Sequence, residues 1–242
     1  MRTRWILAAG LLLPAVWIPA LLAGGRDAVP APGPSSAPAD VAVEQEPSVP
    51  PTAVFAEVLG IPLHLPAPLP RLVAFHEASM EGAIPMLPFG SCRPCRHPRF
   101  RAPPAGGVDL RYAVMDPRGR GSAPTSAVDV VLGGGAPVLS PVSGRVRVVR
   151  PYRLYGRYAD ARVAIVPDGA QGLEVVLLHL RSGRLAPGDR VVAGVTSLGR
   201  VRSFPFRSQV DRYASGRRPH VHIEVVDARA RDQAKDRRGA GG

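Results

Sequence analysis

Four residues in this chain of 242 could together hold a metal ion and move a proton: Asp129, His179, His220 and His222. His220 and His222 lie in residues 219–226, a segment rich in branched side chains that is typical of a β-strand. Because side chains alternate along a strand, both imidazoles point to the same face. Asp129 and His179 each lie in a separate segment of the same kind. Imidazole and carboxylate groups bind zinc and accept protons, so the sequence predicts one or both of these roles.

The elements that must position these residues are short. Glycine and proline, 26 and 28 in number, interrupt the sequence too often for long helices. Between them, residues 105–227 contain a series of apolar runs, among them 126–132, 161–166 and 173–180. Short strands separated by Gly and Pro turns favour an all-β fold, either an antiparallel sandwich or a partly open barrel.

The N-terminal region predicts export. Residues 1–25 begin with a basic stretch and continue into an apolar run, which indicates either a cleaved signal peptide or a retained membrane anchor. Residues 26–53 are rich in Pro and Ala, and we expect a disordered linker there. We therefore expect the remainder of the chain to be extracytoplasmic: secreted, associated with the cell wall or anchored to the membrane.

Two further segments carry weaker patterns. Closely spaced prolines between positions 62 and 70 predict that residues 54–104 form an irregular, Pro-rich extension, in which residues 73–77 read as a short strand or a helix start. Cys92 and Cys95 form a C-x-x-C motif, and in an exported protein this motif indicates a disulfide. Residues 228–242 mix charge with Gly and Ala, which predicts a disordered tail.

The charge balance limits the partners. The formal net charge is +12, and arginine supplies nearly all of the positive charge because Lys235 is the only lysine. An arginine-rich, lysine-poor composition is typical of a GC-rich genome. The arginines are scattered and no nucleic-acid-binding motif is present, so we expect no nucleic-acid partner. A membrane is expected only through a retained N-terminal anchor.

From about residue 122 to 227 the sequence resembles the M23 (LytM/lysostaphin-like) zinc metallopeptidases, which cleave peptides of bacterial peptidoglycan. Five segments carry this resemblance in the order that the family has them: 127–130, 135–146, 177–180, 185–194 and 220–225. The second contains the pattern Gly-x-Pro-Val, the fourth contains Gly-Asp-x-Val, and the last reads His-x-His-x-Glu. The resemblance implies an M23-type β-sheet and a zinc peptidase site.

The resemblance also assigns roles to single residues. It implies that Asp129 and His222 bind zinc and that His179 and His220 are the catalytic histidines, which activate water and stabilise the oxyanion. The family's first zinc ligand is a His four residues before the Asp, and here that position is occupied by Thr125. A neutral hydroxyl is a poor zinc ligand compared with imidazole. Glu224 lies on the same strand face as the histidine pair, and we expect it either to support the ligands through a hydrogen bond or to face solvent, rather than to bind the metal.

Three interpretations follow from this departure. The domain could be an exported zinc endopeptidase of wall cross-link or stem peptides, in which His76 beside Glu77, or else His97, replaces the missing ligand. It could instead be a degenerate domain that binds peptidoglycan peptides without cutting them, or that activates another wall hydrolase. In the third interpretation, the histidines are only a remnant on a general β-scaffold.

Overall fold

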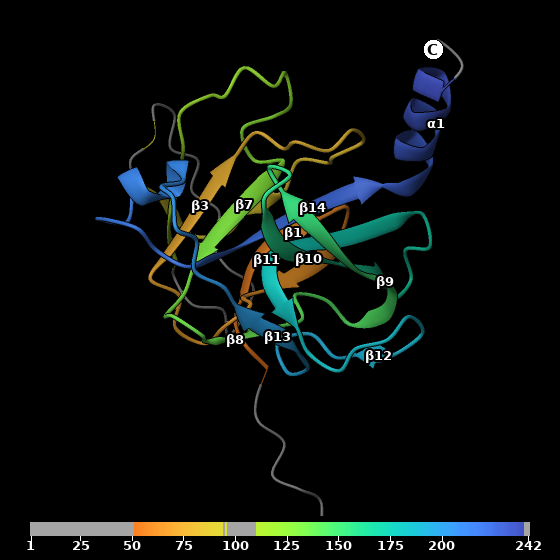
Figure 1. Cartoon of the computed structure of the whole chain (residues 1–242), viewed down its shortest axis with the longest axis horizontal. Coiled ribbons are helices and arrows are strands. Elements are labelled where there is room, and N and C mark those ends of the chain that lie inside the picture. The colour runs from red at the N-terminus through yellow and green to blue at the C-terminus, as the bar shows by residue number, and fades with distance from the viewer. Residues whose placement is uncertain (1–50, 94, 96–109, 240–242) are drawn as a thin grey trace, which may run out of the picture. The chain divides into compact units, whose positions relative to one another are not determined.

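The computed structural model describes residues 51–93, 95 and 110–239 (Figure 1). The expected signal peptide or anchor, most of the linker and His97 lie outside these residues. The described chain consists almost entirely of β-strands, with one α-helix, α1 (Ala228–Gly239), and one 3₁₀ helix, η1 (Gln209–Arg212). The all-β prediction is therefore confirmed.

Eleven strands form one open sheet. Nine of them follow the order β12-β9-β10-β11-β14-β7-β3-β6-β5, while β13 pairs with β11 and with β8. The strands that carry the predicted site pair antiparallel, whereas β3–β6 and β5–β6 are parallel. The bounds are β3 (Leu72–His76), β5 (Ser91–Cys92), β6 (Arg111–Val114), β7 (Ala127–Val131), β8 (Pro137–Leu139), β9 (Gly144–Leu154), β10 (Tyr158–Pro167), β11 (Leu173–Ser182), β12 (Arg190–Val191), β13 (Ser197–Val201) and β14 (His220–Asp227).

Residues 54–93 are more regular than the sequence indicated. Three of their strands form a second sheet in the order β2-β1-β4: β1 (Val54–Val58), β2 (Ile61–His64) and β4 (Leu87–Pro88). Pro62 and Pro88 lie in the two outer strands of this sheet, where a missing backbone N–H is tolerated. The other two strands, β3 and β5, extend the large sheet. These two prolines thus lie in edge strands, and residues 54–93 belong to the β-domain.

The central strands of the large sheet have one apolar face and one polar face. Val128, Val130 and Ile223 are fully buried on the apolar face and join the main core cluster. Burial of one such side chain stabilises the fold by about 1.5–3 kcal/mol. Asp129 and His222 alternate with them and are directed to the opposite face, where they are also buried. Because side chains alternate along a strand, burial of the apolar residues in the core determines which residues are directed to the polar face.

The C-terminal segment also differs from its expectation, because α1 occupies residues for which a disordered tail was predicted. Asp227 caps the helix, since its Oδ1 atom accepts hydrogen bonds from the backbone N–H groups of Arg229 and Ala230 at 2.8 and 3.2 Å. Arg231 on α1 forms an ion pair with the buried carboxylate of Glu174 on β11. A cap and a buried ion pair thus hold a helix whose composition alone suggested disorder.

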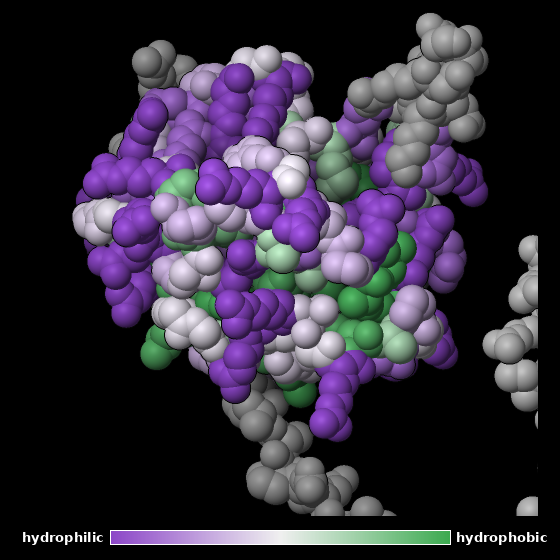
Figure 2. Space-filling view, in the orientation of Figure 1, coloured by the Kyte–Doolittle hydropathy of each residue, from purple (hydrophilic) through white to green (hydrophobic). Residues whose placement is uncertain are grey.

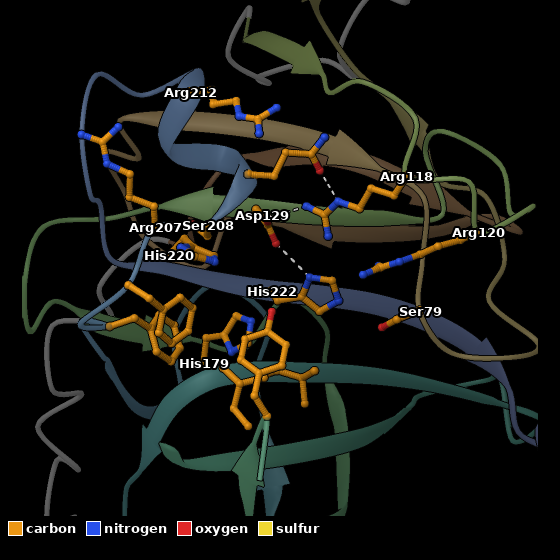
Figure 3. Close-up of a pocket in the computed structure, with 16 residues that line it drawn as sticks. Ser79, Arg118, Arg120, Asp129, His179, Arg207, Ser208, Arg212, His220 and His222 are labelled. Carbon is orange, nitrogen blue, oxygen red and sulfur yellow. Dashed lines mark hydrogen bonds and ion pairs between the residues drawn. The ribbon is translucent and has the colours of Figure 1, made fainter. Parts of the chain in front are cut away.

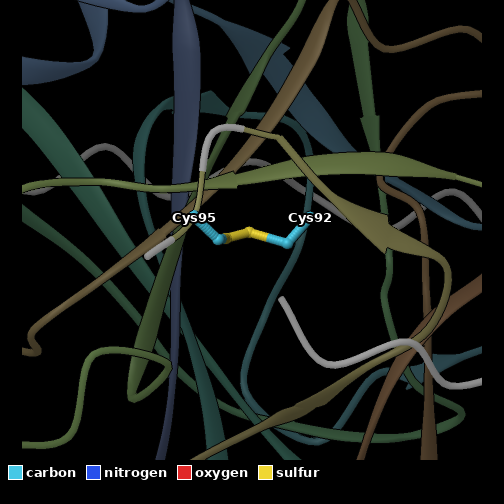
Figure 4. The surroundings of a disulfide bond; sticks show 2 residues. All are labelled: Cys92 and Cys95. Carbon is cyan, nitrogen blue, oxygen red and sulfur yellow. A yellow bond between two sulfur atoms is a disulfide. The ribbon is translucent and has the colours of Figure 1, made fainter. Parts of the chain in front are cut away.

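Cys92 and Cys95 form a disulfide, with their Cα atoms 5.7 Å apart (Figure 4). Hydrophilic side chains cover most of the molecular face shown in Figure 2, with hydrophobic ones between them. Within the described ranges, no helix is long and apolar enough to cross a membrane.

Candidate active site

Three adjacent strands bring three possible metal ligands together on the polar face of the large sheet. Asp129 lies on β7, directly opposite His222 on β14 and opposite Ala74 on β3. His76 follows Ala74 by two residues and therefore lies on the same face of β3. One ligand atom from each of His76, Asp129 and His222 lies within 4.8 Å of the other two. Figure 3 shows Asp129 and His222 at the centre of the pocket described below.

His76 leaves one ring nitrogen without a hydrogen-bond partner. Its Nδ1 atom lies 2.7 Å from the carbonyl oxygen of Glu77, and because a carbonyl only accepts, Nδ1 carries the proton. Its Nε2 atom is buried, makes no hydrogen bond, and lies 3.2 Å from Oδ1 of Asp129. A neutral ring then directs a lone pair at a carboxylate oxygen. Two acceptors this close require a cation or a shared proton between them.

His222 is held at both nitrogens. Nδ1 lies 2.8 Å from Oδ1 of Asp129, and Nε2 lies 2.8 Å from Oε1 of Glu224. Glu224 is fully buried and accepts hydrogen bonds from the N–H and hydroxyl groups of Ser79 and from the N–H of Met80. Glu224 therefore fixes the orientation of the His222 ring, as carboxylates behind metal-binding histidines do.

The charges of this group are coupled. Burial opposes ionisation of Asp129, but the proximity of His76 and His220 and the hydrogen bond from His222 hold its pKa well below the ordinary value. Burial likewise opposes the charged form of His222, yet its bonds to Asp129 and Glu224 raise its pKa to about 9. Burial would raise the pKa of Glu224, but His222 lowers it to about 2. Asp129 is therefore ionised, as a metal-binding carboxylate must be.

His179 reaches the same pocket through a bulge in β11. Its backbone φ is +70°, and the pairing of β10 with β11 shifts register between Ala161 and Val163. Leu177 and Leu180 both join the main core cluster, so the bulge turns Leu178 and His179 together toward the pocket. A left-handed backbone at a non-Gly residue is strained, and such strain concentrates at functional sites.

Asp160 on β10 positions the His179 ring. Its Oδ2 atom lies 2.8 Å from His179 Nδ1 and 2.6 Å from the Tyr152 hydroxyl, while its Oδ1 atom accepts a hydrogen bond from Ala161 N–H at 2.9 Å. The Nδ1 proton of His179 therefore points to Asp160, and Nε2 is left as an acceptor. Burial lowers the pKa of His179, although Asp160 acts in the opposite direction. His179 is thus neutral near pH 7 and able to accept a proton.

His220 completes the group of histidines. Its Nδ1 atom donates to the Arg218 carbonyl at 3.1 Å, so Nε2 is the nitrogen that remains for the pocket. The ring centroids of His179 and His220 are 5.2 Å apart. The four residues predicted from spacing, Asp129, His179, His220 and His222, all line one pocket.

This pocket has a volume of about 550 Å³ and two contrasting walls (Figure 3). One wall is aromatic and consists of Tyr155, Phe204 and Phe206, with ring centroids 5.0 to 5.5 Å apart along the series. The other wall carries arginines. The pocket is open to solvent, while Asp129, His220 and His222 in its lining are buried.

The remaining predicted residues divide into two groups. His76, proposed as a substitute ligand, lies with Asp129 and His222, whereas Thr125 lies in the turn before β7 and is outside this group. Residues that the sequence did not single out include Asp160, Tyr152 and Arg118. They carry no motif, and Asp160 and Tyr152 become partners only through the pairing of β9 with β10.

No protein-family model matches the sequence, and no curated protein matches it. Structural alignments join part of the chain to lysostaphin, with 21% identity over 41% of this chain and a TM-score of 0.31. A zinc-containing peptidase from Vibrio cholerae aligns with 23% identity over 43% of the chain and a TM-score of 0.31. The M23 metalloprotease pseudoalterin, from the deep sea, aligns with 20% identity over 44% and a TM-score of 0.29. The chain covers 35%, 27% and 58% of these three proteins, in that order.

Proposed function

We propose that this chain is an exported zinc metallopeptidase that cleaves peptides of bacterial peptidoglycan, with His76 in place of the ligand missing at Thr125. The observation that carries the proposal is the buried Nε2 atom of His76, which has no hydrogen-bond partner and lies 3.2 Å from Asp129 Oδ1. The ordered motifs of residues 122–227 supply the reaction class and the wall substrate as a resemblance.

The chemistry of the three ligands fits zinc. Two imidazoles and a carboxylate are a common ligand set of catalytic zinc, which keeps a fourth position open. The ion would be held by His76 Nε2, a carboxylate oxygen of Asp129 and His222 Nδ1. When bound there, zinc supplies a Lewis acid that polarises the scissile carbonyl and makes water more acidic. The proton that His222 Nδ1 shares with Asp129 in the metal-free arrangement would be released on binding.

His179 is the general base in this proposal. Its Nε2 atom faces the pocket as an acceptor because Nδ1 is committed to Asp160. It takes a proton from the attacking water and later returns it to the amine that leaves. Asp160 keeps the ring in this tautomer and stabilises the positive charge that the ring acquires, as the orienting carboxylate does in other base-assisted hydrolases.

His220 acts beside it on the same substrate. Its ring lies between His179 and the Arg218 carbonyl, so Nε2 is available near the reacting carbonyl. In its protonated form this nitrogen donates a hydrogen bond to the developing oxyanion. The aromatic wall and the loop that carries Phe204 and Phe206 exclude water from one side of the substrate.

The test combines metal analysis with wall hydrolysis. The purified protein is expected to bind about one equivalent of zinc and to release soluble muropeptides from purified peptidoglycan. His179→Ala should keep the zinc and lose the release. A wild type that binds no zinc contradicts the proposal. Zinc binding and peptidoglycan binding without any release would instead favour a domain that only binds the wall or activates a separate hydrolase.

A further inference from the structure

One wall of the pocket is strongly cationic. Four of its lining residues are arginines: Arg118, Arg120, Arg207 and Arg212. Among the lining residues that the structure describes, Asp129 supplies the single carboxylate, and it is buried against His76 and His222. The pocket lining therefore carries more positive than negative charge, although Asp129 lies 3.8 Å from Arg118 and the Glu77 carboxylate accepts the backbone N–H groups of Arg118 and Arg120.

Arg118 lies closest to the proposed metal ligands. Its Nη2 atom is 3.8 Å from Asp129 Oδ2, its side chain is 22% exposed, and its Nε atom donates to the side-chain oxygen of Gln209 on η1. The guanidinium is thus held in position between Asp129 and Gln209.

Arg120 is placed by the residue that follows the His76 ligand. The carboxylate of Glu77 accepts the backbone N–H groups of Arg118 and Arg120 at 2.7 and 3.0 Å. The carbonyl of Glu77 accepts from Arg120 Nη1 at 3.2 Å and from His76 Nδ1 at 2.7 Å. One residue therefore orients a metal ligand and holds the loop that carries both guanidinium groups.

We propose that this pocket selects peptides that carry a carboxylate, which Arg118 and Arg120 bind beside the scissile bond. The inference rests on the proposed peptidase function and adds the substrate class to it. Guanidinium groups bind carboxylates through paired, charge-assisted hydrogen bonds, and such bonds discriminate against a neutral amide. Arg118 is partly buried and Arg120 is exposed. Tyr155, Phe204 and Phe206 also line the pocket and would take the apolar part of the peptide.

The experiment uses two matched peptide pairs with the zinc-loaded full-length protein. The first pair is acetyl-Ala-Ala-Glu-Ala-Ala-amide and its Gln counterpart, which differ only in the side-chain charge. The second pair is acetyl-pentaalanine with a free or an amidated C-terminus, which distinguishes a chain-end carboxylate from a side-chain one. Titration calorimetry should show at least about tenfold tighter binding of the acidic member of one pair, falling with added salt.

Three variants assign the preference to the arginines. Arg118→Gln combined with Arg120→Gln should abolish it, and Arg184→Gln, at an exposed arginine outside the pocket, should leave it intact. Because Arg118 also holds Gln209, Arg120→Gln alone serves as a second variant, with thermal unfolding as the check of its fold. Equal or absent binding of both members in both pairs, or a preference that survives the double substitution, overturns the inference. Arginine-dependent binding without any cleavage would retain the inference and reject the peptidase function.

Discussion

A neutral histidine offers a lone pair at only one ring nitrogen, and at His76 the Glu77 carbonyl decides which one. Because Nδ1 donates to this carbonyl, Nε2 is left toward Asp129 and His222. The sequence identified His76 only as the better of two possible substitutes, since nothing in a single sequence reveals that β3 pairs with β7. Once Ala74 is placed opposite Asp129, the position of His76 follows from strand geometry.

His76→Ala is expected to weaken zinc binding by about 100-fold or more, because a direct ligand is lost while partners behind a ligand already contribute about 10- to 100-fold. The measurement is zinc titration against a competing chelator. His64→Ala is the matched control, since His64 lies on β2 and bonds to the Thr52 carbonyl outside the metal group. Equal zinc affinity of His76→Ala and wild type would exclude His76 as a ligand.

Asp160→Asn and Glu224→Gln should distinguish a residue that orients the proposed general base from one that orients a proposed metal ligand. Asp160 forms a hydrogen bond with His179, the proposed general base. The Asp160→Asn substitution should therefore lower kcat by about 100-fold or more and leave zinc affinity unchanged. Glu224 forms a hydrogen bond with His222, a proposed metal ligand. The Glu224→Gln substitution should therefore weaken zinc binding by about 10- to 100-fold. Steady-state kinetics and zinc titration on both variants check this. A loss of zinc in Asp160→Asn would show that Asp160 is only structural.

His179, the proposed general base, also shows where alternation along a strand misleads. Regular alternation would place His179 with Val175 and Leu177, both of which lie in the main core. The bulge reverses this, and a bulge requires a pairing partner that the sequence does not display. The match of residues 177–180 to a family motif, rather than strand periodicity, was therefore the useful signal for His179.

At the scale of elements, the proposed metal site joins three strands. Its ligands come from β3, β7 and β14, which are neighbours in the sheet although His76 and His222 lie far apart in the sequence. An ion held by all three opposes separation of β3 from β7. Sequence patterns could not predict which strands are neighbours in the sheet, because each pattern describes one strand at a time.

Removal of zinc should therefore lower thermal stability. Zinc at about 1,000 times its dissociation constant adds about 4 kcal/mol to the free energy of unfolding, which corresponds to a rise of about 10 °C in the unfolding midpoint for a domain of this size. Calorimetric scans with zinc and with excess chelator measure the difference. His222→Ala should show no such response to zinc. An equal midpoint for the loaded and stripped wild type would contradict the predicted site.

At the scale of the whole molecule, the folded unit begins earlier than the pattern of short strands indicated. The expected β-domain started at residue 105, yet strands from Val54 onward contribute Phe55 and Phe75 to the main core. The strand series from residue 126 onward was largely predictable, since Gly and Pro turns separate clear apolar runs. The earlier segment was not, because its prolines are signals of irregular structure unless the strands are known to be at an edge.

Two shortened chains test this boundary. A chain of residues 105–227 lacks β3 and is expected to aggregate and to bind no zinc, because the edge of β7 and a large apolar surface become exposed. A chain of residues 51–242 keeps every described strand and should bind zinc as the full chain does. Solubility, circular dichroism and zinc content are the readouts. A soluble, zinc-binding product from residues 105–227 would refute the role of β3.

The separation of His76 from His222 sets a condition on biosynthesis. The ribosome releases His76 first, Asp129 later and His222 last of the three. A nascent chain that has not reached His222 cannot present all three groups to an ion. The proposed metal site would therefore form only after the residues of β14 have joined those of β3 and β7.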